Sequence, residues 1–261
     1  MNSLIWLTIL CCSSTLVSSQ NQPQNIFILA GQSNMAGRGG PDGLEAKDMV
    51  PPPQCNPNPR ILRFSKAGAW EEARDPLHRD IDIGKKNGVG PGMPFANTLL
   101  AKDPSIGVIG LVPCAIGDTA LKRWSRGGDL YVTMMERTRA ALAGGGVLRG
   151  LMWYQGEADS GKMEDATSYK TRFEQFVADV RAELQMPTLP VVQVAINVQL
   201  PDYVNTVKAL RESQKTANVS NMKTIDAWGL PTVSDKVHLT AESQVKLGQM
   251  MADAFLQIAP Q

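Results

Sequence analysis

Five short apolar segments stand out along the chain, and each predicts a buried β-strand. Each holds a run of Val, Ile and Leu rather than an alternation of apolar and polar residues, which is typical of strands covered on both faces. The segments are Asn25–Ala30, Ile106–Val112, Leu148–Tyr154, Pro190–Ile196 and Met222–Ala227. We therefore expect a five-stranded, mostly parallel sheet.

Helical patterns lie between and after these segments. Residues 129–145 repeat apolar positions at helical spacing and end on glycines that suit a C-cap. Residues 165–185 carry aromatic and aliphatic side chains on one stripe with charges opposite. Residues 205–218 and 240–259 make two more helices, the last of which Thr240 could N-cap. Alternation of strands and helices favours an α/β layered fold.

Small and polar residues gather where the predicted strands end. Gly31–Ser33 follows the first strand, "PCAIGDT" follows the second and "QGEADS" follows the third. In parallel sheets the functional crevice lies beyond the carboxyl ends of the strands. The irregular, Pro- and Gly-rich stretch from Gly37 to Pro94 is long for a compact domain. We interpret it as a loop wrapped around the active site rather than as a linker.

The N-terminal residues predict a secretory signal. "MNSLIWLTILCCSSTLVSSQ" has no charged side chain, an apolar run from Leu4 to Cys12 and small residues after it. This pattern indicates a signal peptide over residues 1–19 and a single secreted domain over residues 20–261. The apolar run is too short to span a bilayer, which argues against a membrane anchor. We therefore expect no membrane attachment once the signal peptide is removed.

The charge composition of the chain bears on which classes of partner it can bind. The chain of 261 residues has 26 basic and 25 acidic side chains and a net charge of +1. Partners such as nucleic acid or a membrane surface usually require a clustered basic excess, so neither is expected. The apolar content of 43% is typical of a globular protein. The oligomeric state is left open by these features.

Cysteine and histidine usage argues against a metal site. The sequence has no Cys-x-x-Cys and no His-x-x-x-His pairing, so we expect no metal ion. Cys55 and Cys114 remain after signal removal and could form one disulfide in an oxidising compartment. Cys114 ends an apolar run, which favours a buried structural thiol over a nucleophile. The triplet at Asn218 is compatible with glycosylation.

Ser33, in "GQSNM", is the first candidate for chemistry. The Gly-x-Ser-x-Gly nucleophile elbow is excluded because position 35 is Met. The dinucleotide and P-loop fingerprints also fail, since Ala36 stands where each needs glycine. A serine at a helix start remains, where free backbone N–H groups can bind an oxyanion. The alternative is a plain loop of small residues.

The whole chain has two histidines, so a serine nucleophile has few candidate bases. His238 follows Asp235 by three residues, close enough for the carboxylate to bind Nδ1–H while Nε2 faces a serine. A structural or surface pair is the alternative. His78 lies among charged residues in the long loop, and we expect it to be a solvated loop histidine.

Four segments taken together resemble the sequence blocks of a known superfamily. In chain order they are "FILAGQSNMAGRG", "PCAIGDTALKRW", "WYQGEAD" and "SDKVHLT". They are similar to the four blocks of the SGNH (GDSL-like) hydrolases, and within these to sialate O-acetylesterase-like carbohydrate esterases of family six, including plant members. The blocks run from residue 27 to residue 240. The resemblance implies a flavodoxin-like three-layer sandwich and a Ser-His-Asp triad without metal or organic cofactor.

The resemblance also implies roles for individual residues. Ser33 matches the nucleophile, His238 the base and Asp235 the carboxylate that orients it. Gly117 in "AIGDT" matches the glycine whose backbone N–H joins that of Ser33 in the oxyanion hole. The third block of the superfamily usually carries an Asn that completes the hole, and Gln155 is the expected substitute.

Neighbouring residues have two interpretations each. Gln32 and Asn34 could contact substrate or could form the turn. Glu157 could be a hydrogen-bonding neighbour of the site or could hold its own loop. Arg123 and Trp124 could line a sugar-binding rim, although a Trp at a helix edge is as often a packing residue.

These inferences combine into a functional hypothesis. The sequence predicts a secreted serine esterase that removes acyl groups, foremost acetyl, from carbohydrate or another small ester. A carbohydrate-binding protein without turnover is one alternative, and the presence of every triad residue argues against it. A lipase or thioesterase on the same fold is another, although no long apolar lid segment favours it.

Overall fold

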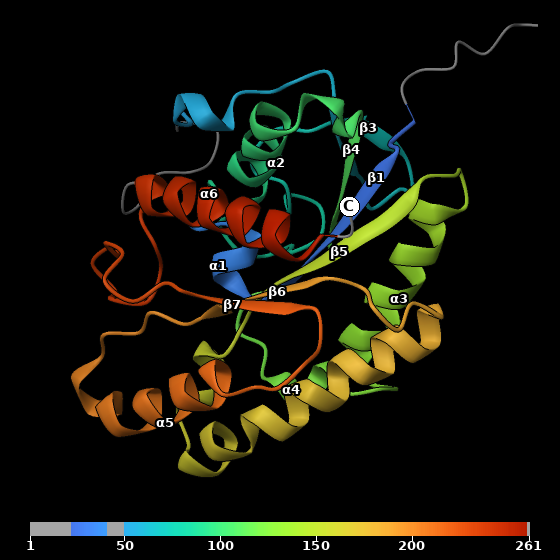
Figure 1. Ribbon diagram of the computed structural model, residues 1–261. Coiled ribbons are helices and arrows are strands. Elements are labelled where there is room, and N and C mark those ends of the chain that lie inside the picture. The colour runs from blue at the N-terminus through green and yellow to red at the C-terminus, as the bar shows by residue number, and fades with distance from the viewer. Residues whose placement is uncertain (1–21, 41–49, 260–261) are drawn as a thin grey trace, which may run out of the picture.

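The computed structural model describes residues 22–40 and 50–259, so the expected signal peptide over residues 1–19 lies outside the described residues. The described chain forms one twisted sheet with helices packed on both faces (Figure 1). This confirms the predicted α/β fold. None of the described helices is long and apolar enough to cross a membrane.

The sheet has seven strands among the described residues, in the order β3-β2-β4-β1-β5-β6-β7. All neighbouring strands run parallel except β2 and β3, which form an antiparallel pair. The five predicted strands are present with small shifts of their ends, and their relative order, 2-1-3-4-5, is that of flavodoxin-like sheets. The strands are β1 (Asn25–Gly31), β2 (Ile61–Phe64), β3 (Trp70–Glu72), β4 (Ile109–Pro113), β5 (Val147–Tyr154), β6 (Val191–Ala195) and β7 (Met222–Asp226).

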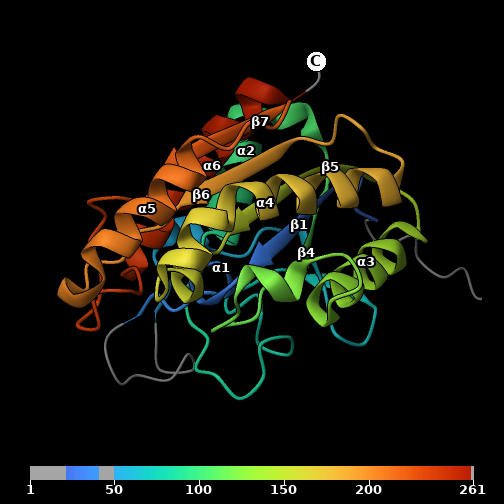
Figure 2. The same cartoon turned by 90° about the horizontal axis from the view of Figure 1, so that it is seen from below.

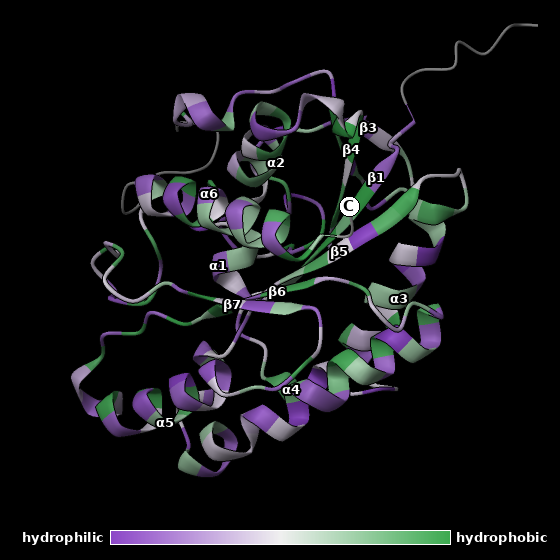
Figure 3. Ribbon diagram, viewed as in Figure 1, coloured by the Kyte–Doolittle hydropathy of each residue, from purple (hydrophilic) through white to green (hydrophobic). Residues whose placement is uncertain are grey.

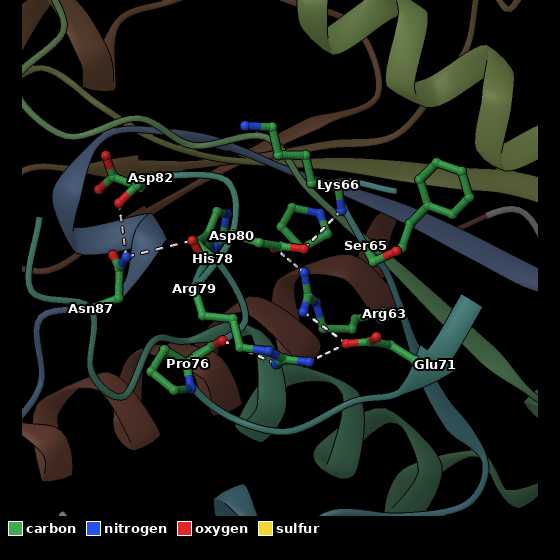
Figure 4. A network of polar contacts seen from close by, with 12 residues as sticks. Arg63, Ser65, Lys66, Glu71, Pro76, His78, Arg79, Asp80, Asp82 and Asn87 are labelled. Atoms are coloured by element: carbon green, nitrogen blue, oxygen red, sulfur yellow. Dashed lines mark hydrogen bonds and ion pairs between the residues drawn. The ribbon is translucent and has the colours of Figure 1, made fainter. Parts of the chain in front are cut away.

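The predicted count of five strands is wrong, because β2 and β3 come from the segment between Gly37 and Pro94 that was expected to be irregular. Both strands are short, and Arg63 interrupts the apolar pattern of β2. The Arg63 side chain is nevertheless buried, since its guanidinium forms ion pairs with Glu71 and Asp80 (Figure 4). An ion-paired cation inside the sheet therefore concealed the strand from a hydrophobicity pattern.

Helices form a layer on each side of the sheet. Helices α2 and α6 pack against each other on one face, and α3, α4 and α5 cover the opposite face (Figures 1 and 2). Thr240 caps α6 as predicted, because its hydroxyl oxygen accepts the N–H of Ser243 at 3.2 Å. The helices are α1 (Ser33–Ala36), α2 (Gly92–Lys102), α3 (Asp129–Leu142), α4 (Met163–Leu184), α5 (Val204–Lys215) and α6 (Ala241–Ile258).

Aromatic clusters fill the space between the sheet and each helical layer. On one face Phe27 of β1 meets Phe95 of α2 and Phe255 of α6, with ring centroids 5.2 and 5.0 Å apart. On the other face Trp153 of β5 packs on Phe176 of α4 at 4.7 Å. Truncating such a side chain to Ala costs about 3–5 kcal/mol of stability. The central strands are accordingly apolar along most of their length (Figure 3).

His78 is not the solvated loop residue that was expected, because its side chain is 0% exposed. Its carbonyl accepts the N–H groups of Ile81 and Asp82, both at 2.9 Å, and closes a turn within the network of polar contacts drawn in Figure 4. Burial lowers the pKa of the imidazole to about 3, so the ring is neutral at physiological pH. The charged residues that neighbour His78 in sequence suggested a solvated side chain, whereas the folded chain buries it.

The depressed pKa of His78 predicts a pH dependence of stability. Unfolding exposes the ring and returns its pKa to about 6.5, so the unfolded state binds the extra proton between about pH 3 and pH 6.5. Because of His78, the free energy of unfolding decreases as the pH falls below about 6.5, by roughly 2 kcal/mol between pH 7 and pH 5.

Denaturant unfolding of wild type and His78→Leu at pH 7 and pH 5 tests this expectation. The difference in unfolding free energy between the two proteins should shift in favour of the variant by that amount at pH 5. An unchanged difference would show that His78 takes up no proton on unfolding. Other titrating groups contribute equally to both proteins and cancel in this comparison.

Candidate active site

The turn after β1 places Ser33 at the carboxyl edge of the sheet, where α1 begins (Figure 1). Gly31 has a φ of 131°, and a Cβ at this position would lie 2.0 Å from the carbonyl oxygen of Tyr154. Only glycine fits such a close approach. The N–H of Gln32 then donates to the same carbonyl at 2.9 Å. The turn is thereby fixed to β5 directly before the serine.

The three residues expected to form a triad come together in space. His238 Nε2 lies 2.8 Å from Ser33 Oγ, although 205 positions separate the two residues in sequence. His238 Nδ1 lies 2.5 Å from Asp235 Oδ2. The other oxygen of Asp235 accepts the N–H groups of Val237 at 2.8 Å and of His238 at 2.9 Å. Asp235 thus holds both the imidazole and the backbone that carries it.

Asp235 stays ionised in this arrangement. Burial by itself acts to raise the pKa of its carboxyl group, but the backbone N–H donors of His238 and Val237 and the imidazole outweigh that effect. The net pKa lies below the usual range for aspartate. A carboxylate beside Nδ1 favours the tautomer whose Nε2 can accept a proton from a serine hydroxyl.

Asn34 connects the serine turn to the histidine segment. Its Nδ2 donates to the carbonyl of Val237 at 3.1 Å and to Glu157 Oε1 at 2.7 Å. Its Oδ1 accepts the N–H of Leu239 at 3.0 Å. The two backbone groups flank His238, so one buried side chain holds both sides of that residue. Of its two interpretations, this geometry favours a structural role over substrate contact.

Glu157 belongs to the 3-10 helix η5 (Glu157–Asp159) and contributes to the wall of the site. Burial raises the pKa of its carboxyl group, and the hydrogen bond from Asn34 only partly opposes this effect. Its second oxygen is buried and has no hydrogen-bond partner among the described residues. Glu157 therefore supports Asn34 from beside the pocket.

Gln155 does not lie where its expected role requires. Its side chain is 0% exposed, and its Nε2 is within reach of Thr119 O at 2.9 Å, Asp159 Oδ2 at 2.5 Å and Gln32 Oε1 at 3.2 Å. Its Oε1 accepts the hydroxyl of Tyr169 at 2.9 Å. An amide has two N–H bonds, and both are used inside the protein. The expectation that Gln155 faces an oxyanion disagrees with this geometry.

Gln32 offers an amide group where Gln155 does not. Its Oε1 accepts the N–H groups of Ala158 at 3.2 Å and Gly156 at 3.4 Å, in addition to the amide of Gln155. These bonds fix the orientation of the side chain. The Gln32 amide nitrogen donates to no acceptor among the described residues, and Gln32 lines the same pocket as Ser33. Sequence reasoning had given Gln32 two interpretations, contact with substrate or formation of the turn, and had not considered it as an oxyanion donor.

Gly117 lies against the serine in a turn after β4 that Thr119 closes by donating its hydroxyl to the Ile116 carbonyl at 2.8 Å. A Cβ on Gly117 would lie 3.6 Å from the Cβ of Ser33 and 2.7 Å from a guanidinium nitrogen of Arg38. The backbone N–H groups of Ser33 and Gly117 donate to no acceptor within the described part of the chain. Both can therefore donate to a ligand.

A pocket of about 330 Å³ opens at this point. Ser33, His238, Gln32 and Gly117 line it, and the segment from Gly37 to Pro94 contributes Arg38 and Lys85. Two residues of the segment that was expected to wrap around the active site thus reach the pocket, while the same segment also contributes β2 and β3 to the sheet.

Arg38 is held rigidly in the pocket wall. Its guanidinium forms an ion pair with the buried carboxylate of Asp82 and donates to Asn87 Oδ1 at 2.6 Å. Figure 4 shows Asn87 beside Asp82, to whose carbonyl oxygen its Nδ2 donates at 3.0 Å.

Two residues expected at a sugar-binding rim lie elsewhere. Trp124, at the end of the 3-10 helix η4 (Leu121–Trp124), is 0% exposed and packs edge-on against Trp153 at 5.1 Å. Arg123 is exposed, forms an ion pair with Asp129 and does not line the pocket. Trp124 is therefore a core residue, and the packing interpretation was the right one.

The two cysteines are separate, free and buried. Burial raises the pKa of the Cys114 thiol to about 11, which keeps it protonated and weakly nucleophilic at neutral pH. No group of three or more His, Cys, Asp or Glu side chains that could hold a metal ion occurs among the residues described. Asn218 is exposed between α5 and β7.

Comparison with known proteins finds a relative that matches over most of both chains. "Probable carbohydrate esterase At4g34215" of Arabidopsis thaliana is 46% identical over 246 residues, which cover 92% of this chain and 93% of that protein. Its X-ray structure matches with a TM-score of 0.85 at 45% identity and covers 90% of this chain and 98% of the other.

More distant structures share the fold. NanS matches with a TM-score of 0.73 at 19% identity, covering 91% of this chain and 98% of the other. XAC1771, a carbohydrate acetylesterase from Xanthomonas citri, matches with a TM-score of 0.65 at 21% identity, covering 90% of this chain and 56% of the other.

The family described as "Carbohydrate esterase, sialic acid-specific acetylesterase" matches residues 23–257, nearly the whole described chain. Together with the 46% identity to the Arabidopsis protein, this match shows that the chain belongs to that carbohydrate esterase family and is a carbohydrate acetylesterase, a carboxylic ester hydrolase.

Proposed function

We propose that this protein is a secreted esterase that removes O-acetyl groups from carbohydrate through an acyl-enzyme on Ser33. The observation that carries the proposal is the continuous hydrogen-bonded chain from Ser33 Oγ through His238 to Asp235, with distances of 2.8 and 2.5 Å. This is the geometry by which an imidazole base activates a serine hydroxyl. Secretion rests on the sequence pattern of residues 1–19 alone.

In the first half of the reaction Ser33 Oγ attacks the ester carbonyl while His238 Nε2 takes its proton. Asp235 stabilises the imidazolium that results. The carbonyl oxygen becomes an oxyanion, which the N–H groups of Ser33 and Gly117 and the amide of Gln32 are placed to meet. A donor of this kind contributes about 3–4 kcal/mol in a well-measured hydrolase.

Collapse of the tetrahedral intermediate releases the sugar. His238 gives its proton to the leaving oxygen, so the carbohydrate departs as an alcohol and the acetyl group stays on Ser33. Water then attacks the acetyl-enzyme with His238 as base, and acetate leaves with Ser33 restored. A non-catalytic binding protein would have no need of the preassembled contact between serine and histidine.

The nucleophile assignment predicts the behaviour of Ser33→Ala. Hydrolysis of p-nitrophenyl acetate should fall by at least about a thousandfold, because the residual rate would come from binding and the oxyanion donors alone. Ser125→Ala is a suitable control, since Ser125 is exposed and outside the pocket. Equal rates for wild type and Ser33→Ala, with folding verified by circular dichroism, would refute the assignment.

The Gln32 assignment predicts a specific effect of Gln32→Glu. Glutamate keeps an oxygen that can accept the N–H groups of Gly156 and Ala158 but cannot donate to an oxyanion when ionised. We expect kcat for p-nitrophenyl acetate to fall about 100-fold or more with little change in KM, as for loss of one oxyanion donor. Full activity of the Gln32→Glu variant would exclude the amide as a donor.

A further inference from the structure

A second cavity adjoins the active-site pocket. It measures about 220 Å³ and shares Glu157, Ala158 and Val237 with the pocket. On its far side it is lined by Leu200 and by Tyr203, whose side chain is 40% exposed. Because Glu157, Ala158 and Val237 line both spaces, the second cavity lies next to the one that contains Ser33.

A third cavity continues the same path. It measures about 510 Å³ and shares Val198 and Leu200 with the second. Helix α5 forms one side, and Trp228, just after β7, also lines the cavity. The three spaces therefore lie next to one another, and we call the second and third cavities together the distal groove.

Trp228 is exposed to an unusual degree and held in a fixed position. Its side chain is 53% exposed, although large aromatic residues normally bury most of their surface. One face of the indole stacks on the guanidinium of Arg211, 4.6 Å from a ring centroid. Arg211 is itself buried and donates to both carboxylate oxygens of Asp226 at 2.8 and 3.0 Å. With one face covered, exposure of this size leaves the opposite face to solvent.

An exposed, rigid aromatic ring in a groove suits carbohydrate. One face of a pyranose ring presents C–H groups, which pack on the electron-rich face of an aromatic ring, while the hydroxyl groups point to the sides. Gln199, Lys208 and Glu212 line the groove beside Trp228 and can bond such hydroxyl groups. Ligand sites combine apolar walls with a few polar groups in this way.

The volumes indicate how much ligand fits. Sites for small molecules span about 300–1,000 Å³, and the active-site pocket alone is near the lower limit at about 330 Å³. The pocket and the two cavities of the distal groove together slightly exceed the upper limit. The site therefore has room for more than the sugar that carries the ester.

We propose that the distal groove binds the carbohydrate chain of the substrate, with a sugar ring remote from the ester stacked on Trp228. The enzyme then acts on acetylated oligosaccharide or polysaccharide in preference to a free acetylated monosaccharide. This proposal rests on the proposed esterase function, since the position of the distal groove beside the pocket of Ser33 points to the substrate as its occupant.

The test compares two substitutions at Trp228 on two kinds of substrate. Acetate release is measured from acetylated xylo-, manno- and galacturono-oligosaccharides and from the matching acetylated monosaccharides, with p-nitrophenyl acetate as the small ester. Trp228→Leu removes the ring face, and we expect kcat/KM on the preferred oligosaccharide to fall about tenfold. Trp228→Tyr retains a ring face and should lose much less. Both variants should hydrolyse p-nitrophenyl acetate at the wild-type rate.

Val147→Ala provides a matched control. Val147 is 54% exposed at the start of β5, at the end of the sheet opposite the active site, and its truncation should change none of these rates.

The possible outcomes distinguish failure of the groove proposal from failure of the proposed esterase function. Absence of hydrolysis of p-nitrophenyl acetate by wild type would refute the esterase function itself. If that activity is present, the groove is refuted by full activity of Trp228→Leu on the oligosaccharide. It is equally refuted by a parallel loss on the small ester, or by wild type cleaving no oligosaccharide faster than its monosaccharide.

Discussion

The contact of Gly31 with the Tyr154 carbonyl is the constraint on which the site depends. Two central strands approach so closely here that no side chain fits at position 31, and the same carbonyl binds the N–H of Gln32. The direction of the chain after β1 is therefore set by the sheet, the most rigid part of the molecule. Ser33, the next residue, is positioned by this turn before its own hydrogen bond to His238 is considered.

The residues on either side of Ser33 extend this rigidity in two directions. Gln32 binds backbone N–H groups of the loop after β5, and Asn34 binds backbone groups on both sides of His238. Three consecutive side chains thus attach the nucleophile turn to the wall of the pocket and to the segment of the base. These hydrogen bonds favour one arrangement of the turn, because another would leave several buried polar groups without partners.

Much of this could be predicted from the sequence, for identifiable reasons. The buried strands were recognised because runs of Val and Ile are typical of strands covered on both faces. The proposal of Ser33, Asp235 and His238 rested on the presence of only two histidines and on the resemblance to known sequence blocks. The predictions that disagree with the structure share a cause, and they concern Gln155, His78 and the strand around Arg63. Each was judged by chemical type or by neighbours in sequence, whereas its environment is set by residues from other parts of the chain.

Trp124 and Trp228 illustrate the same limit. Both follow regular elements near the carboxyl edge of the sheet, and a sequence pattern treats them alike. Trp124 lies under α4 and is fully buried, whereas Trp228 stacks on Arg211 at the surface. Only the packing of the helical layer decides which of the two indoles reaches solvent.

The hydrogen bonds of Asn34 bear on the second half of the reaction. Once Ser33 carries an acetyl group, its Oγ has no proton to share, and the direct bond between nucleophile and imidazole is lost. The bonds of Asn34 to Val237 and Leu239 involve no reacting atom and are unaffected by acylation. In the proposed mechanism these bonds would keep the imidazole beside the ester carbon of the covalent intermediate, so that deacylation would not require the histidine segment to return.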